Sequence, residues 1–355
     1  MIAVCFVLPL LIWGGFIEVS NSPKWLMLSL ALPVLLYWYR PRWTVCQIAG
    51  LAFLCWGGLT ALWAESPALV LPALWQFGLL WVASLIGSGM TEPKMRRCLF
   101  AFCLAMVLNA GLAWLQKFHG LDIVPEVSRP AGTFGNGNWL AEAGLLAVIT
   151  AIALGRPVLA LAVVPAWILP LSRNALIAGG ILSTLWLWKK TKAGAVVLAL
   201  IGIGVGAYHA KSIDWEQSSV ALRASLYANT AAMVLDHPMG VGLGNYWTAY
   251  PPYHDAVIPS PESGYKLQQR PRTAHNDAMT VLAETGPIGL FLLAMVLLRR
   301  GRFAWLIGGF FALGLFAFPL FQPVTGFLAF LVAGHCSRSL PVFRPVLRKR
   351  QFAAP

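Results

Sequence analysis

The sequence predicts an all-α membrane protein with about twelve transmembrane helices. Three observations support this fold class. Of the 355 residues, 58% are hydrophobic and only 11% are charged, whereas soluble domains carry about 25% charged residues. Apolar segments of about 15–22 residues, long enough to cross most of a bilayer core, recur along the chain. The connections between these segments alternate in charge, as a polytopic topology requires.

Twelve apolar segments are predicted as transmembrane helices. The 16 Trp fit this assignment, since Trp is enriched at the membrane–water interface. The first segment has neither a basic start nor a small-residue cleavage site, so it is expected to be a span and not a cleaved signal peptide. The segments cover residues 2–19, 23–39, 43–63, 68–88, 98–118, 138–154, 157–171, 174–188, 193–208, 278–298, 303–318 and 324–337.

Basic residues mark every second connection, and Glu92 is the single acid among them. The positive-inside rule places these connections and both termini in the cytoplasm. Much of the net charge of +13 is therefore a topology signal, and no binding of nucleic acid is expected. The basic residues are Arg40, Arg42, Lys94, Arg96, Arg97, Arg156, Lys189, Lys190, Lys192, Arg299, Arg300, Arg302, Arg338, Arg344, Arg348, Lys349 and Arg350.

The chain is predicted to have three parts. Residues 1–208 hold the first nine spans, 209–277 form a long periplasmic loop, and 278–355 hold the last three spans and a basic cytoplasmic tail. A loop of this length is usually functional. Ser218 or Ser219 can cap a helix from Val220 to Asp236, which Pro238 ends. We expect this helix to lie along the outer interface of the membrane and to carry Arg223.

Arg173 is a candidate site residue on physical grounds. The spans at 157–171 and 174–188 would each rise only about 22 Å, against a hydrocarbon core of about 30 Å. Their joint, Ser172-Arg173-Asn174, should therefore lie slightly below the outer surface. An arginine there is costly unless it faces protein, water or an anionic ligand. Glu142 or Asp277 are possible pairing partners.

His275 and Asn276 precede the tenth span, where the long loop returns to the membrane. An imidazole titrates near neutral pH, so His275 is a candidate general base. A helix cap or an interfacial residue is the alternative. Glu284 follows about two and a half turns later on the same helix, and the glycines of 286–289 permit close helix packing.

Two arginines beside a histidine would suit a diphosphate. A guanidinium group keeps its charge and binds phosphate oxygens bidentately. Arg173 and Arg223 are the candidates, although Arg223 alone could snorkel from an interfacial helix.

Two glycine-containing segments accompany these candidates. The segment GVGLGN, which includes Gly244 and Asn245, is predicted as a tight turn pressed against a ligand or a helix. In the loop before residue 138, Arg129 is a further candidate, and Asn136 suits sugar hydroxyls or helix capping.

No cofactor is expected. The outer connections contain no DxD, HExxH or Cys/His cluster, so no metal ligands are visible. No P-loop or GxSxG motif occurs either. The six Cys lie in hydrophobic segments or near the basic C-terminus, as small buried side chains do.

Taken together, these motifs resemble the O-antigen ligase and polymerase superfamily of bacterial polytopic glycosyltransferases. The resemblance covers roughly residues 112–298, in the order of the family. It rests on RPAGTFGN (129–136), SRNA (172–175), Arg223 before DHPMGVGLGN (236–245), and His275-Asn276 followed after nine residues by GPIG (286–289).

The resemblance implies a GT-C-like membrane fold and an active site on the periplasmic face of the bacterial inner membrane. The donor would be a glycan on undecaprenyl diphosphate. His275 matches the catalytic histidine of the ligases, and Arg173 and Arg223 match arginines that bind the diphosphate. Arg129, Asn136, Gly244, Asn245, Asn276 and Glu284 are further expected to contact substrate. The implied transfer is metal-independent and inverting.

The implied acceptor is lipid A-core, as for a ligase. A polymerase joining repeat units is the first alternative. An O-linking protein oligosaccharyltransferase is the next, although no large outer domain follows the twelfth span.

A transporter is the rival class, since twelve spans with cytoplasmic termini describe many permeases. Transporters usually show repeated halves and ionisable groups near the midplane of the membrane. Here the polar features gather in one asymmetric loop, which favours an enzyme over a transporter or an assembly protein.

Overall fold

A computed structural model describes residues 1–16, 18–121, 130–210, 219–258 and 271–339. Within this part of the chain every regular element is a helix, as predicted. Four of the described helical segments are long and apolar enough to cross a membrane, namely Val45–Leu62, Pro67–Gly89, Glu92–His119 and Asp277–Leu297. Shorter apolar helices accompany them, so the number of crossings stays a prediction.

Most predicted spans coincide with a helix. They correspond to α2 (Asn21–Trp38), α3 (Val45–Leu59), α4 (Val70–Gly89), α5 (Glu92–His119), α6 (Gly137–Ala153), α7 (Pro157–Ile168), α8 (Arg173–Trp188), α9 (Lys192–Ala210), α12 (Asp277–Leu297), α13 (Ala304–Gly314) and α14 (Pro323–Cys336).

The first span was predicted wrongly. In place of a continuous helix over 2–19, the structure has α1 (Ile2–Val7) and a single 3-10 turn, η1 (Leu8–Leu10). Leu11 then has an extended backbone, with φ −71° and ψ 122°. Pro9 lacks an amide hydrogen and opposes continuation of an α-helix. Hydropathy detected the apolar segment and missed this end.

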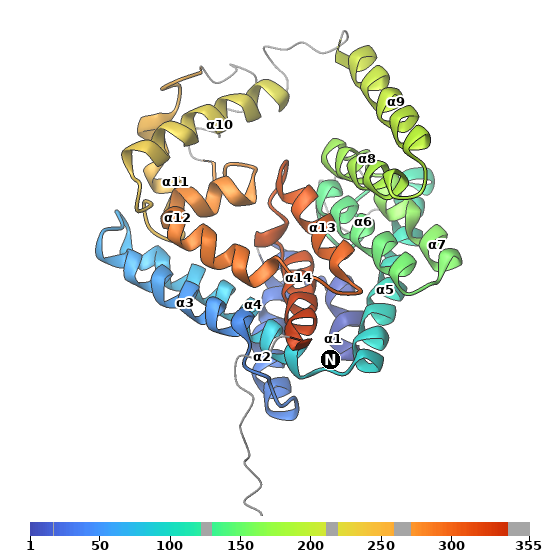
Figure 1. Cartoon of the computed structure of the whole chain (residues 1–355), viewed down its shortest axis with the longest axis horizontal. Coiled ribbons are helices and arrows are strands. Elements are labelled where there is room, and N and C mark those ends of the chain that lie inside the picture. Colours follow the sequence, from blue (N-terminus) through green and yellow to red (C-terminus); the bar gives the residue numbers. More distant parts are fainter. Residues whose placement is uncertain (17, 122–129, 211–218, 259–270, 340–355) are drawn as a thin grey trace, which may run out of the picture.

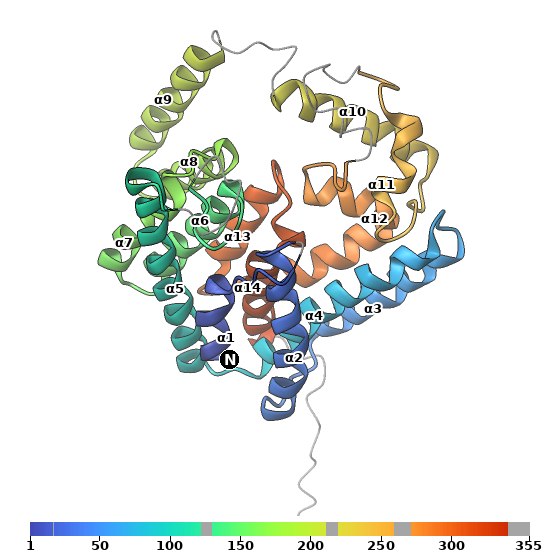
Figure 2. The same ribbon diagram turned by 180° about the vertical axis from the view of Figure 1, so that it is seen from behind.

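Helix α14 lies at the centre of the molecule and is buried along most of its length. It packs closely against α4. Figures 1 and 2 show α5 to α9 on one side of it, and α3, α10 and α12 on the other. The chain therefore forms one helical core with two flanking groups of helices.

The connections gather at two opposite ends of the bundle. At the basic end, Glu92 contacts His335 at 3.1 Å and Arg302 at 3.6 Å. At the other end, Lys24 donates to the carbonyl of Thr133 at 2.9 Å. This separation agrees with the alternation of charge in the sequence. Which end faces the cytoplasm stays a prediction.

The helix predicted inside the long loop is present as α10 (Ser219–Asp236). Its side chains Leu226 and Met233 are buried in a second hydrophobic cluster, together with Val241 and Tyr246. Figures 1 and 2 show α10 beside α12 and the short helix α11 (Tyr246–Ala249). The apolar side of α10 thus packs on protein, a contact that the sequence did not indicate. The position of α10 relative to the membrane stays a prediction.

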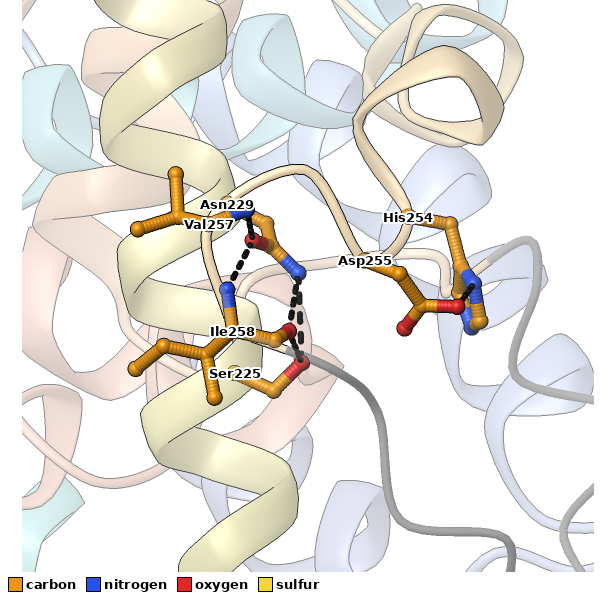
Figure 3. A network of polar contacts seen from close by, with 6 residues as sticks. All are labelled: Ser225, Asn229, His254, Asp255, Val257 and Ile258. Carbon is orange, nitrogen blue, oxygen red and sulfur yellow. Dashed lines mark hydrogen bonds and ion pairs between the residues drawn. The ribbon is translucent and has the colours of Figure 1, made fainter.

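A buried asparagine anchors the following loop to α10 (Figure 3). The Asn229 side-chain oxygen accepts from the backbone amides of Val257 at 2.8 Å and Ile258 at 3.1 Å. Its amide donates to the carbonyl of Ile258 at 3.1 Å and to the hydroxyl of Ser225 at 3.2 Å. Because the side chain uses its acceptor and its donor together, α10 and residues 257–258 are held in one arrangement.

The glycine-rich turn after α10 packs against α12. Amides of Val241 and Gly242 donate to the carbonyls of Ala283 and Glu284, both at 2.9 Å. Gly240 has φ +83°, and a Cβ there would come within 2.4 Å of the Glu284 carbonyl oxygen. Only glycine combines that backbone angle with such a close approach. The turn was expected to press against a ligand or a helix, and in the structure it packs against the helix α12.

Candidate functional site

His275 lies directly before α12, in a left-handed backbone conformation with φ +54°. Such angles are uncommon for residues other than glycine, although His is among the more tolerant. Asn276 caps α12, since its side-chain oxygen accepts from the amide of Met279 at 3.0 Å. The imidazole is therefore fixed at the point where the loop becomes helix. Strained positions of this kind often occur at functional sites.

Tyr227 of α10 holds this turn in place. Its hydroxyl lies 3.2 Å from the carbonyl oxygen of His275 and 3.0 Å from that of Leu315. Asn276 also donates to Leu315, at 3.1 Å. The imidazole ring meets the ring of Phe318 edge-on, with 5.2 Å between centroids. Three segments far apart in sequence thus position one histidine.

The imidazole is neutral at physiological pH. Burial, and after it the positive charge of Arg223, lower the pKa of His275 to about 4. Neither ring nitrogen hydrogen-bonds any residue in the described part of the chain. A neutral imidazole with an unoccupied nitrogen can accept a proton.

Arg173 and Arg223 lie within electrostatic range of each other although 50 residues separate them in sequence. Burial is the main cause that lowers the pKa of Arg223, and the charge of Arg173 lowers it as well. Tyr227 and Glu142 oppose these two effects. Arg173 is the first residue of α8 and is exposed. A positive side chain at a helix N-terminus, within electrostatic range of a second one, favours an anionic ligand.

Two buried acidic side chains lie beside this group. Glu142 of α6 is 2% exposed, and it interacts electrostatically with Arg223. Asp277, in the first turn of α12, interacts with Glu142 and accepts the amide of Leu320 at 3.1 Å. Both had been expected as possible partners of Arg173. Within the described residues neither makes an ion pair with Arg173, and Glu142 acts on Arg223 instead.

The remaining candidates at the glycine turn have structural partners. Asn245 accepts the amide of Ser66 at 2.9 Å, and Glu284 accepts the amide of Tyr246 at 3.3 Å. A Cβ on Gly244, at φ +76°, would come within 2.8 Å of the carbonyl oxygen of Leu69. These contacts fix the loop to α12 and to the α3–α4 connection. A role of Gly244, Asn245 and Glu284 in binding substrate stays a prediction.

Asn136 caps α6, accepting the amide of Asn138 at 2.8 Å. Capping was the alternative to sugar binding, and it is confirmed. Arg129 lies outside the described residues. Within the described part, no group of three or more His, Cys, Asp or Glu side chains has an arrangement that could hold a metal ion.

Tyr227→Phe tests how the histidine is positioned. The variant keeps the ring but loses the hydroxyl that reaches the carbonyls of His275 and Leu315. One hydrogen bond of this kind contributes about 0.5–1.5 kcal/mol. If the activation free energy rises by about that amount, turnover should fall about 2- to 10-fold. The Michaelis constant for the donor should change little. Tyr253→Phe, whose hydroxyl bonds Asp236 at 2.9 Å, is the matched control and should retain full turnover.

The pH profile tests the electrostatics of the site. Because the pKa of His275 lies at about 4, the free protein keeps a neutral base down to about pH 5, so kcat/KM should stay level from neutral to that pH. Arg223→Gln removes a positive charge and should raise this pKa, which moves the acid limb of kcat/KM to higher pH. An acid limb near pH 6.5 that the substitution leaves unchanged would contradict the effect of Arg223 on the pKa of His275.

The comparisons with known proteins concern the same region. Residues 158–294 match a family model described as O-antigen ligase. The matched range contains Arg173, Arg223 and His275. A search among curated proteins gave no match.

Proposed function

We propose that this chain is a ligase of the O-antigen ligase and polymerase superfamily. Residues 158–294 match the family model described as O-antigen ligase. It transfers a glycan from undecaprenyl diphosphate to a hydroxyl of lipid A-core, without a metal ion and with inversion at the anomeric carbon. One observation carries the proposal: the charge of Arg223 acts on His275, and the charge of Arg173 acts on Arg223, so side chains from three separate segments form one electrostatic group. Such a group suits a substrate pair in which the histidine faces the acceptor hydroxyl and the arginines bind the diphosphate of the donor.

The reaction follows from these charges. His275 takes the proton of the acceptor hydroxyl while its oxygen attacks the anomeric carbon. The bond from that carbon to the diphosphate oxygen breaks on the opposite face, and the diphosphate leaves with the electron pair. Arg173 and Arg223 hold the leaving group and stabilise the negative charge that develops on it.

Donor binding strengthens the base. In the free protein, burial and the field of Arg223 lower the pKa of His275 to about 4, which makes the imidazole a weak proton acceptor. The bound diphosphate offsets the field of Arg223, so the pKa of His275 rises towards its ordinary value. The base therefore becomes effective when the donor is in place.

The proposed location is the bacterial inner membrane, with the site at the periplasmic end and both termini in the cytoplasm. Two features support this orientation. The basic connections gather at the end opposite to His275, as the positive-inside rule requires. The donor lipid also presents its diphosphate at the membrane surface, where an arginine at the N-terminus of α8 can reach it.

An acceptor assay tests the function. Purified protein is incubated with glycan-loaded undecaprenyl diphosphate and, separately, lipid A-core, a second lipid-linked glycan, or pilin. A ligase consumes lipid A-core and releases undecaprenyl diphosphate. Consumption of the second glycan would make the protein a polymerase, and glycosylated pilin would make it an oligosaccharyltransferase. An intact donor in all three arms would overturn the assignment as an enzyme of this type.

A further inference from the structure

An apolar groove lies at the basic end of the bundle, away from His275. It has a volume of about 1070 Å³ and is open between α1, the first turns of α5 and the connection from α6 to α7. Its apolar walls come from both helices and from that connection, namely Ile2, Ala3, Phe6, Pro93, Phe100, Ala101, Leu104 and Leu154. A groove of this size and lining is large enough for acyl chains.

Three arginines also line the groove, namely Arg96, Arg97 and Arg156. Arg96 donates to the carbonyl of Leu154 at 3.0 Å, while its Nη1 is buried without a hydrogen-bond partner. The guanidinium of Arg156 lies 4.8 Å from the centre of the Phe100 ring. Two of the three charged groups are thus held at the groove wall by protein contacts.

These charges have no acidic partner within the described residues. Glu92, the acid nearest in sequence to Arg96 and Arg97, instead contacts Arg302 and His335. A buried guanidinium nitrogen without a partner is costly, and three neighbouring positive charges repel one another. An anion with several oxygen acceptors would relieve both costs, because guanidinium groups match phosphate geometry.

We propose that this groove binds an anionic glycerophospholipid. The acyl chains lie along the apolar walls, and the phosphate is held by Arg96, Arg97 and Arg156. A basic pocket between helices at the cytoplasmic side is a recognised form of lipid headgroup site. An apolar groove with fixed arginines selects a lipid by its charge, whereas apolar walls alone would accept any lipid.

The bound lipid would touch three parts of the fold at once. α1 contributes Ile2, Ala3 and Phe6 to the groove, and the α6–α7 connection contributes Leu154 and Arg156. The lipid would therefore add a link between α1 and the far end of α6, the helix that carries Glu142, beside the direct packing of α5 on both. This inference rests on the groove alone and does not depend on the proposed reaction.

Native mass spectrometry of the purified full chain tests the site. The protein is equilibrated with phosphatidylglycerol or phosphatidylcholine of identical acyl chains. We expect at least 10-fold higher retention of phosphatidylglycerol. Arg97→Ala, which removes an exposed side chain, should lower that retention, and Arg96→Ala combined with Arg156→Ala should abolish the preference. Arg300→Ala, an exposed arginine at the same end outside the groove, is the matched control and should retain the lipid fully.

A second variant tests the groove without removing any of the three arginines. Ala3→Trp places a large ring in the groove from the exposed side of α1, so it should exclude the lipid while all three arginines remain. Equal retention of both lipids by the unmodified protein would overturn the proposal. Undiminished retention of phosphatidylglycerol by Ala3→Trp and by the arginine variants would do so as well.

Discussion

Replacing His275 with alanine is expected to abolish glycan transfer while the protein still inserts into the membrane and accumulates. The loss of a general base lowers rates by about 10²–10⁴, and no other described imidazole is coupled to the arginine pair. The ring also packs against Phe318, so a small loss of stability is expected. The measurement is turnover of lipid-linked glycan by purified protein, normalised to the folded fraction.

Two further variants separate the chemistry from the backbone. His275→Gly also lacks the base but relieves the positive φ of +54°, so it should be as inactive as the alanine variant and fold at least as well. His237→Ala removes an exposed imidazole from the same loop and should retain full activity. Wild-type turnover by His275→Ala would exclude the catalytic assignment.

The helices of this chain could largely be predicted from the sequence, because long apolar segments separated by basic connections leave few alternatives in a bilayer. The end of α1 was missed. A span was expected as far as residue 19, yet the helix ends near Pro9. Hydropathy measures how well a segment tolerates lipid and is insensitive to one missing amide donor. The proline was the signal that would have corrected the prediction.

The site was predicted less completely than the fold. His275, Arg173 and Arg223 could each be selected from local arguments about charge and topology. Tyr227 was missed, because its contact with His275 spans 48 residues and no local pattern encodes it. Its position four residues after Arg223 was a usable signal, since residues at that spacing share one face of a helix.

Glu142 was noticed only as a pairing partner. It is an acid inside an apolar helix, and such residues in membrane segments are rarely without a role. In the structure it interacts electrostatically with Arg223. The sequence could not give this pairing, because it depends on how α6 and α10 pack and not on either helix alone.

The two arginines give the second large effect. Arg223→Lys and Arg173→Lys keep the positive charge but replace a planar fork with a point charge, which cannot hold two phosphate oxygens at once. Removing one donor that stabilises developing charge lowers kcat by about 10²–10³. We expect losses of that order for Arg223→Lys, since Arg223 is half-buried beside His275, and a smaller loss for the exposed Arg173.

The double variant distinguishes one diphosphate site from two independent charges. If both arginines hold the same diphosphate, the second substitution should lower kcat by a smaller factor in the double variant than it does in the single variant. The first substitution has then already loosened the leaving group. Arg272→Lys, an exposed arginine in the same loop, is the matched control and should be neutral. The measurement is kcat and the Michaelis constant for the donor in all four proteins. Strictly additive losses, or full activity of Arg223→Lys, would contradict a shared diphosphate site, because two groups that hold one leaving group do not act independently.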